Sequence, residues 1–119
     1  MGTLLVRSLL DGEPRAPFSV LRIRMGPGAS HPPLWHARTF EFFLVLKGSV
    51  HARIGQVSRR LRRGDFVMLP PGASHEFRAG PGGVEVLTVF GPGLDLGNPD
   101  IVVPAPGRPP RRPARRVRR

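Results

Sequence analysis

The sequence predicts an all-β protein, built as an antiparallel sandwich or barrel of short strands. Glycine and proline, 15 each among 119 residues, cluster at sites that divide the chain into segments of four to eight residues. These segments are rich in Val, Phe, Leu and Ile, which is typical of β-strands. No window longer than ten residues keeps a helical period free of Gly and Pro, so we expect few or no helices. The expected strands are Phe18–Met25, Phe40–Lys47, Val50–Ile54, Phe66–Leu69, Ser74–Arg78 and Val84–Phe90.

The strand expected at Phe40–Lys47 carries apolar residues on both of its faces. Successive side chains of a strand point to opposite faces, so Phe42, Leu44 and Leu46 form one apolar row. A bare row of this kind is prone to association and needs a cover. We therefore expect a homodimer that packs sheet on sheet through this row or through the Phe18–Met25 strand.

The positive charge is concentrated at the carboxyl end of the chain. The formal net charge is +11, and the segment from Ala105 onward contains seven arginines and no acid. After Pro104 the sequence has too few apolar residues to fold, so we expect one barrel domain at residues 1–103 and a disordered Arg/Pro-rich tail at 104–119. We interpret the charge of the tail as incidental; binding of nucleic acid or of an anionic surface is the alternative.

The composition excludes several classes of protein. The chain has no cysteine, which excludes disulfides, thiolate zinc sites, iron–sulfur clusters and a cysteine nucleophile. No stretch approaches the 18 apolar residues of a membrane-spanning helix, and the first residues lack the apolar run of a signal peptide. We therefore expect a cytoplasmic protein.

Two of the four histidines stand in a pattern that indicates metal binding. His31 lies in a proline-rich loop and His51 on the polar face of its strand, and both suit an ordinary surface role. Glu41, by contrast, opens an apolar strand, where a carboxylate needs a cationic partner. Together with His36 and His75 it makes two imidazoles and one carboxylate, the ligand set of a facial triad on a first-row divalent metal.

The spacing around these residues resembles the two motifs of the cupin family. The first motif is G-x5-H-x-H-x(3,4)-E-x6-G and the second is G-x5-P-x-G-x2-H-x3-N, and every spacing agrees over residues 28–79. Two identities differ, because Leu34 stands where the first histidine is expected and Ala79 where the asparagine is expected. The matching residues are Gly28, His36, Glu41, Gly48, Gly64, Pro70, Gly72 and His75.

The resemblance implies a small single-domain cupin, folded as a double-stranded β-helix (jelly-roll) barrel with a metal ion in its mouth. In such a barrel we expect Gly48 to close a hairpin after the Glu41 strand, because glycine accepts a positive φ. The ligands that carry over are His36, Glu41 and His75, and they suit Fe²⁺, Mn²⁺, Ni²⁺ or Zn²⁺ with water in the remaining positions. Leu34 cannot coordinate a metal, and His31 is the alternative fourth ligand.

Two functions follow from the resemblance. One is a metal-dependent enzyme that acts on a small organic substrate as a dioxygenase, decarboxylase or isomerase, with a pocket wall formed by Leu34, Phe43, Val45 and Phe77. The alternative is a metal-free or weakly metal-binding module that senses a small ligand without chemistry. No helix-turn-helix segment accompanies the expected barrel, so a sensor of this kind would act on a partner protein.

Overall fold

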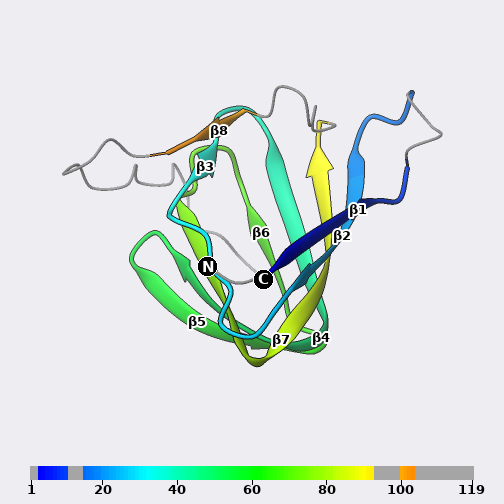
Figure 1. Ribbon diagram of the computed structural model, residues 1–119. Coiled ribbons are helices and arrows are strands. Elements are labelled where there is room, and N and C mark those ends of the chain that lie inside the picture. Colours follow the sequence, from blue (N-terminus) through cyan, green and yellow to red (C-terminus); the bar gives the residue numbers. More distant parts are fainter. Residues whose placement is uncertain (1–2, 11–14, 93–99, 104–119) are drawn as a thin grey trace.

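The computed structural model describes residues 3–10, 15–92 and 100–103, and this part of the chain contains strands and turns but no helix. The expected all-β fold is confirmed (Figure 1). The expected tail at 104–119 lies outside the described residues. None of the described segments forms a helix with the length and hydrophobicity of a transmembrane span. The strands are β1 (Leu4–Ser8), β2 (Ser19–Met25), β3 (Trp35–His36), β4 (Phe40–Ile54), β5 (Val57–Arg62), β6 (Phe66–Leu69), β7 (His75–Gly91) and β8 (Ile101–Val102).

The strands form one large antiparallel sheet and one small one. The large sheet has the order β1-β2-β7-β4-β5, and β6 pairs with β4 beside it. The small sheet consists of β3 and β8. Figure 1 shows the large sheet curving into a cup, with β1 and β2 on one side, β5 on the other, and β3 and β8 at the opposite end from the bend of β4 and β7.

The two long strands β4 and β7 hold the barrel together, since they pair along almost their full lengths. Phe40–Val45 pairs with Val86–Gly91, and Val50–Ile54 pairs with His75–Ala79. The register shifts between these two halves, and such bulges let a strand bend sharply and serve two walls of a barrel.

The expectation that Gly48 closes a hairpin is wrong. Gly48 lies inside β4, at the register shift where β4 crosses β7. Its φ is 80°, and a Cβ built there would lie 2.2 Å from the carbonyl oxygen of Gly83. The glycine is needed for this close approach of two backbones rather than for a turn. The expected break between Phe40–Lys47 and Val50–Ile54 is thus a bend in one strand.

Two other glycines of the motifs lie at turns before strands of the second half of the barrel. Gly64 has a φ of 89° and precedes β6, and Gly72 has a φ of 87° and precedes β7. The core lies inside the large sheet and is formed by apolar side chains that alternate with exposed ones along β4, β6 and β7. Its most deeply buried members include Val45, Val50 and Leu61.

Candidate metal centre

Three strands bring the expected ligands together at the mouth of the barrel. His36 ends β3, Glu41 is the second residue of β4, and His75 is the first residue of β7. All three side chains are buried, and each offers one ligand atom within 4.8 Å of the others. This is the only such group of His, Cys, Asp and Glu side chains within the described ranges.

The distances fit one ion between the three side chains. Oε1 of Glu41 lies 3.4 Å from Nε2 of His36 and 3.5 Å from Nε2 of His75. These separations exceed the usual hydrogen-bond range. With metal–ligand distances of about 2.0–2.2 Å, adjacent ligand atoms lie about 2.8–3.1 Å apart around an octahedral ion and about 3.3–3.6 Å apart around a tetrahedral one. Both distances from the Glu41 carboxylate therefore match those between neighbouring ligands of a tetrahedral first-row divalent metal, and all three ligand atoms lie within 4.8 Å of one another.

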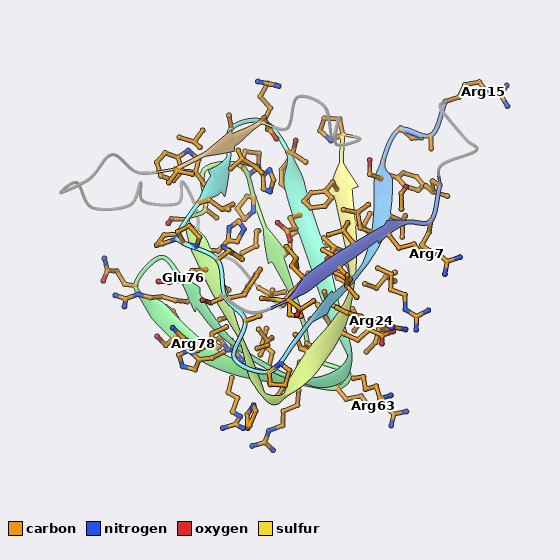
Figure 2. All side chains as sticks on the ribbon, in the orientation of Figure 1. Arg7, Arg15, Arg24, Arg63, Glu76 and Arg78 are labelled. Atoms are coloured by element: carbon orange, nitrogen blue, oxygen red, sulfur yellow. The ribbon has the colours of Figure 1, made fainter. Side chains whose placement is uncertain are left out.

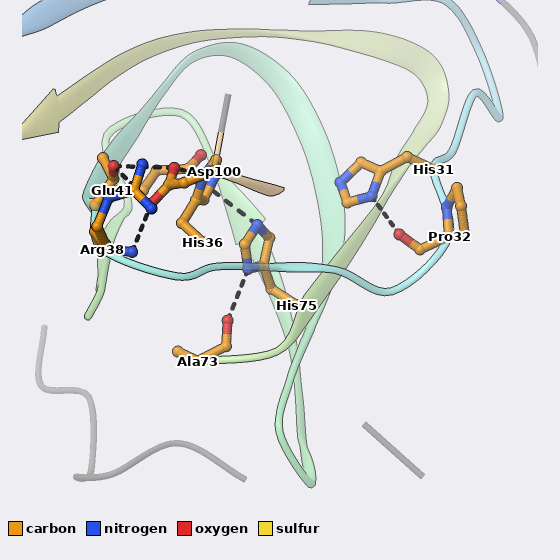
Figure 3. A network of polar contacts seen from close by, with 9 residues as sticks. His31, Pro32, His36, Arg38, Glu41, Ala73, His75 and Asp100 are labelled. Carbon is orange, nitrogen blue, oxygen red and sulfur yellow. Dashed lines mark hydrogen bonds and ion pairs between the residues drawn. The ribbon is translucent and has the colours of Figure 1, made fainter. Parts of the chain in front are cut away.

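The other ring nitrogen of each histidine is held by an acceptor. Nδ1 of His75 lies 3.0 Å from the carbonyl oxygen of Ala73, and Nδ1 of His36 lies 3.2 Å from Oδ1 of Asp100 (Figure 3). A carbonyl and a carboxylate can only accept, so both Nδ1 atoms carry the hydrogen. A hydrogen bond of this kind fixes the tautomer and the ring orientation of a metal-binding histidine.

These contacts leave three acceptors facing one another. In the neutral form each Nε2 presents a lone pair, and both Nε2 atoms lie within 3.5 Å of the carboxylate of Glu41. Acceptors that converge in a buried site without a donor repel each other. A cation at their centre removes that repulsion, and two imidazoles with one carboxylate are a donor set suited to a divalent metal. The residues present thus fit the ion that the sequence predicts.

The pKa values of the two histidines shift in opposite directions. Burial lowers the pKa of His75 below its usual 6.5, despite the charge of Glu41. Burial also acts to lower the pKa of His36, but the negative charges of Glu41 and Asp100, with the hydrogen bond to Asp100, outweigh it and raise that pKa above 6.5. His75 is therefore neutral and ready to bind a metal near neutral pH, while on His36 a metal competes with a proton.

Asp100 is a part of the site that the sequence did not reveal. It precedes β8, and its side chain is 3% exposed. Burial acts to raise its pKa, but hydrogen bonds from the backbone N–H of Arg38, from His36 and from the Thr39 hydroxyl lower it. A carboxylate more than 60 residues from its histidine has no motif spacing that would identify it, and only the pairing of β3 with β8 brings it near.

The structure also locates the two residues considered for the missing fourth ligand. Leu34 pairs with His75 through two backbone hydrogen bonds of 3.0 and 2.8 Å, so it aligns a ligand without being one. His31 lies outside the ligand group, and its Nδ1 lies 2.8 Å from the carbonyl oxygen of Pro32. Its ring contacts that of His75 edge-on at 6.0 Å. His31 therefore lies beside the site without joining the other ligand atoms.

Of the residues expected to form the pocket wall, some lie beside the histidines and others lie in the core of the barrel. Phe77 contacts the rings of both His31 and His75, and Phe43 stacks on Phe77 with the ring centroids 4.6 Å apart. Val45 is 1% exposed and belongs to the core. Beside Phe43, in register across the β4–β7 pair, lies Thr88, whose buried hydroxyl has no hydrogen-bond partner among the residues that the structure describes.

Comparison with protein families decides the classification. A family model described as a cupin domain matches residues 21–90. The chain belongs to the cupin family. The match covers β2 through almost all of β7 and therefore includes all three ligand positions of this cupin.

Solved structures agree on the fold of this cupin. KdgF from Halomonas sp. superposes with a TM-score of 0.68 at 21% identity, over 75% of this chain and 78% of its own. An oxalate oxidase in complex with glycolate superposes with a TM-score of 0.69 at 26% identity, over 84% of this chain and 54% of its own. Oxalate decarboxylase from Bacillus subtilis superposes with a TM-score of 0.71 at 21% identity, over 86% of this chain and 28% of its own. The cupin thus spans about half of the oxalate oxidase. A comparison with curated protein sequences finds no match.

Proposed function

We propose that this cupin binds one divalent metal ion through Nε2 of His36, Nε2 of His75 and the carboxylate of Glu41. The single observation that supports it is the convergence of three buried ligand atoms that, when both histidines are neutral, have no donor among them. Fe²⁺, Mn²⁺, Ni²⁺ and Zn²⁺ all accept such a ligand set.

We further propose that the bound metal serves the turnover of a small organic molecule with oxygen ligands. Three protein ligands leave open coordination positions, and Leu34 supplies none. A divalent ion would act there as a Lewis acid toward a substrate oxygen. The similarity to an oxalate oxidase in complex with glycolate favours a hydroxy acid or dicarboxylate.

The surrounding residues have distinct parts in this proposal. Glu41 offsets the charge of the ion, and Asp100 and the Ala73 carbonyl hold the two imidazoles in the binding tautomer. Phe77 lies against the ring of His75 and Phe90 against that of His36, and these apolar rings limit the access of water. The Thr88 hydroxyl, which lies deeper in the barrel, offers a hydrogen bond to a ligand or to an ordered water.

The experiment is elemental analysis of the protein purified without chelator, followed by uptake of added Fe²⁺, Mn²⁺, Ni²⁺ and Zn²⁺. We expect close to one metal per chain, lost in His75→Ala. The matched control is His51→Ala, which removes an exposed histidine from β4. Absence of near-stoichiometric metal in the untreated protein, together with no uptake of any of the four ions, contradicts the proposal.

A second candidate function, a ligand-binding module without chemistry, is favoured by Leu34 in place of the first motif histidine. The metal-loaded and metal-free proteins are incubated with hydroxy acids, dicarboxylates and sugars, and both Tm and the products are measured. Stabilisation that needs no metal, with no product, supports the module. A product that forms only in the presence of the metal supports the function as a metal-dependent enzyme.

We also propose that the cupin forms a homodimer through the outer face of β4 and β6. Phe42 on β4 contacts Phe66 on β6, with the ring centroids 5.5 Å apart. Phe66 and Met68 are each 42% exposed, and Phe40 is 48% exposed. A contiguous apolar surface of this kind is typical of a protein interface, and a second copy that packs against it symmetrically would cover it.

A further inference from the structure

A second part of the barrel surface carries unpaired positive charge. On the outer face of β4, β5 and β7, arginines stand at positions 53, 60, 62 and 78, and all four are exposed. These four residues are named here the arginine face. Arg53 lies on the second half of β4, Arg60 and Arg62 on β5, and Arg78 on the first half of β7, whereas the apolar surface lies on the first half of β4 and on β6.

The strand register places these arginines in neighbouring rows. His51 on β4 is opposite Arg60 on β5 and opposite Arg78 on β7, so the three side chains form one row across three strands. Arg53 and Arg62 lie two positions away along their strands, in the rows on either side. Neighbouring strands lie about 4.8 Å apart, and side chains on one face recur about every 7 Å along a strand. The four arginine side chains are therefore regularly spaced on one face of the sheet.

The charges of the arginine face are not neutralised within the described part of the chain. None of its four guanidinium groups forms an ion pair there, whereas Arg22 and Arg24 on β2 both pair with Glu85. Glu76 is the one acid at an outward position among these strand segments, opposite Arg53. Figure 2 shows Glu76 and Arg78 on the β5 side of the barrel, away from Arg7 and Arg24.

We propose that the arginine face binds the phosphate backbone of a nucleic acid duplex. Arginine forms bidentate hydrogen bonds with phosphate oxygens, and a duplex presents a regular array of phosphates on both strands. The outward positions of the face hold no Phe, Tyr or Trp, and the ring of His51 is their one aromatic group, so the face offers little stacking to the bases of a single strand. They also hold no large apolar side chain to insert into a membrane, which favours a duplex over a lipid surface.

The test compares two charge-matched variants of the full chain. Arg60→Gln/Arg78→Gln removes the two arginines that flank His51, and the control Arg7→Gln/Arg24→Gln removes two exposed arginines from β1 and β2. Both keep every arginine beyond residue 103. Binding of a fluorescent mixed-sequence DNA duplex is measured by anisotropy from about 50 to 200 mM salt, the range over which phosphate contacts dominate the change in affinity.

We expect the duplex to bind the unmodified protein and the control with the same salt dependence. Each phosphate contact contributes about 0.9 to the slope of log K against log salt. Loss of two contacts lowers the slope by about 2, so that between 50 and 200 mM salt the affinity of Arg60→Gln/Arg78→Gln falls about 12-fold less than that of the control.

Three outcomes overturn the proposal. One is no binding of the duplex by the unmodified protein at the lowest salt. Another is an equal slope for both variants, which would assign binding to other cations of the chain. The third is that vesicles containing phosphatidylserine, but not the duplex, bind in a manner that depends on Arg60 and Arg78. Circular dichroism and Tm of each variant confirm that the barrel is folded.

Discussion

Replacement of Asp100 by asparagine tests whether the tautomer of His36 controls metal binding. In the protein one carboxylate oxygen of Asp100 accepts the backbone N–H of Arg38, and the other faces Nδ1 of His36. Asparagine has only one acceptor oxygen. If that oxygen keeps the N–H of Arg38, the NH₂ group faces His36 and donates to Nδ1. The hydrogen of His36 then moves to Nε2, where it points at Glu41 and blocks the metal.

The size of the effect follows from the position of Asp100 behind a ligand. Changes to residues that hold a metal-binding histidine lower metal affinity by about 10- to 100-fold, which is about 1.4 to 2.7 kcal/mol. Asparagine is close to aspartate in shape and keeps one hydrogen bond to the backbone, so we expect the barrel to stay folded. Alanine removes every contact of the carboxylate, and Asp100→Ala should lose stability as well as metal affinity.

The assay is isothermal titration of Zn²⁺ and Mn²⁺ into metal-free protein, with urea unfolding of the same samples. The matched control is Asp65→Asn, since Asp65 also accepts a backbone N–H, that of Arg62 at 2.9 Å, but lies at the turn before β6. We expect metal affinity to fall in Asp100→Asn and not in Asp65→Asn. Unchanged affinity in a folded Asp100→Asn protein would refute the reasoning.

Two further substitutions and one titration test the fold, the electrostatics of the site and the proposed interface. Gly48→Ala forces a side chain against the carbonyl of Gly83 at a φ of 80°, so unfolding in urea should show a loss of at least about 2 kcal/mol, and a loss below about 0.5 kcal/mol contradicts it. In the metal-free protein, NMR titration should place the pKa of His36 above 6.5 and that of His75 below it, and the reverse order contradicts the site electrostatics. The raised pKa of His36 adds stability that is complete below pH 6.5 and is lost as pH rises through its folded value. Phe66→Asp should convert a dimer into a monomer in light scattering, and a monomeric unmodified protein contradicts the proposed interface.

Much of the fold was predictable because the local patterns are strong. Short apolar segments between Gly and Pro clusters predicted most of the strands. The continuity of β4 and β7 was not predictable. Gly48 is a turn residue in its local sequence, and only the approach of Gly83 from another part of the chain explains why it stands in a strand.

The candidate site, too, was predictable only in part. His36, Glu41 and His75 were predicted from their spacing, since the strands that carry them are fixed by nearby turns. Asp100 was not, because its contact with His36 depends on the pairing of β3 with β8, two strands of two residues each. Pairing between such short and distant segments has no periodicity that a single sequence displays.

The sequence did not predict the arginine face, for a related reason. In the sequence the arginine tail dominates the charge, while Arg60 and Arg78 are separated by the whole of β6. The register of β4 with both β5 and β7 aligns them on either side of His51. Antiparallel pairing of three strands thus creates a charged surface that the linear order of the residues does not indicate.

The central claim is that the two imidazoles bind a divalent ion through Nε2 while Nδ1 keeps its hydrogen. Nitrogen-15 NMR of histidine-labelled protein, recorded before and after addition of Zn²⁺, measures this directly. We predict that the Nε2 resonances of His36 and His75 both shift at one equivalent of Zn²⁺, while their Nδ1 atoms stay protonated. Coordination through Nδ1, or Nε2 resonances that do not respond to the metal, would contradict the account.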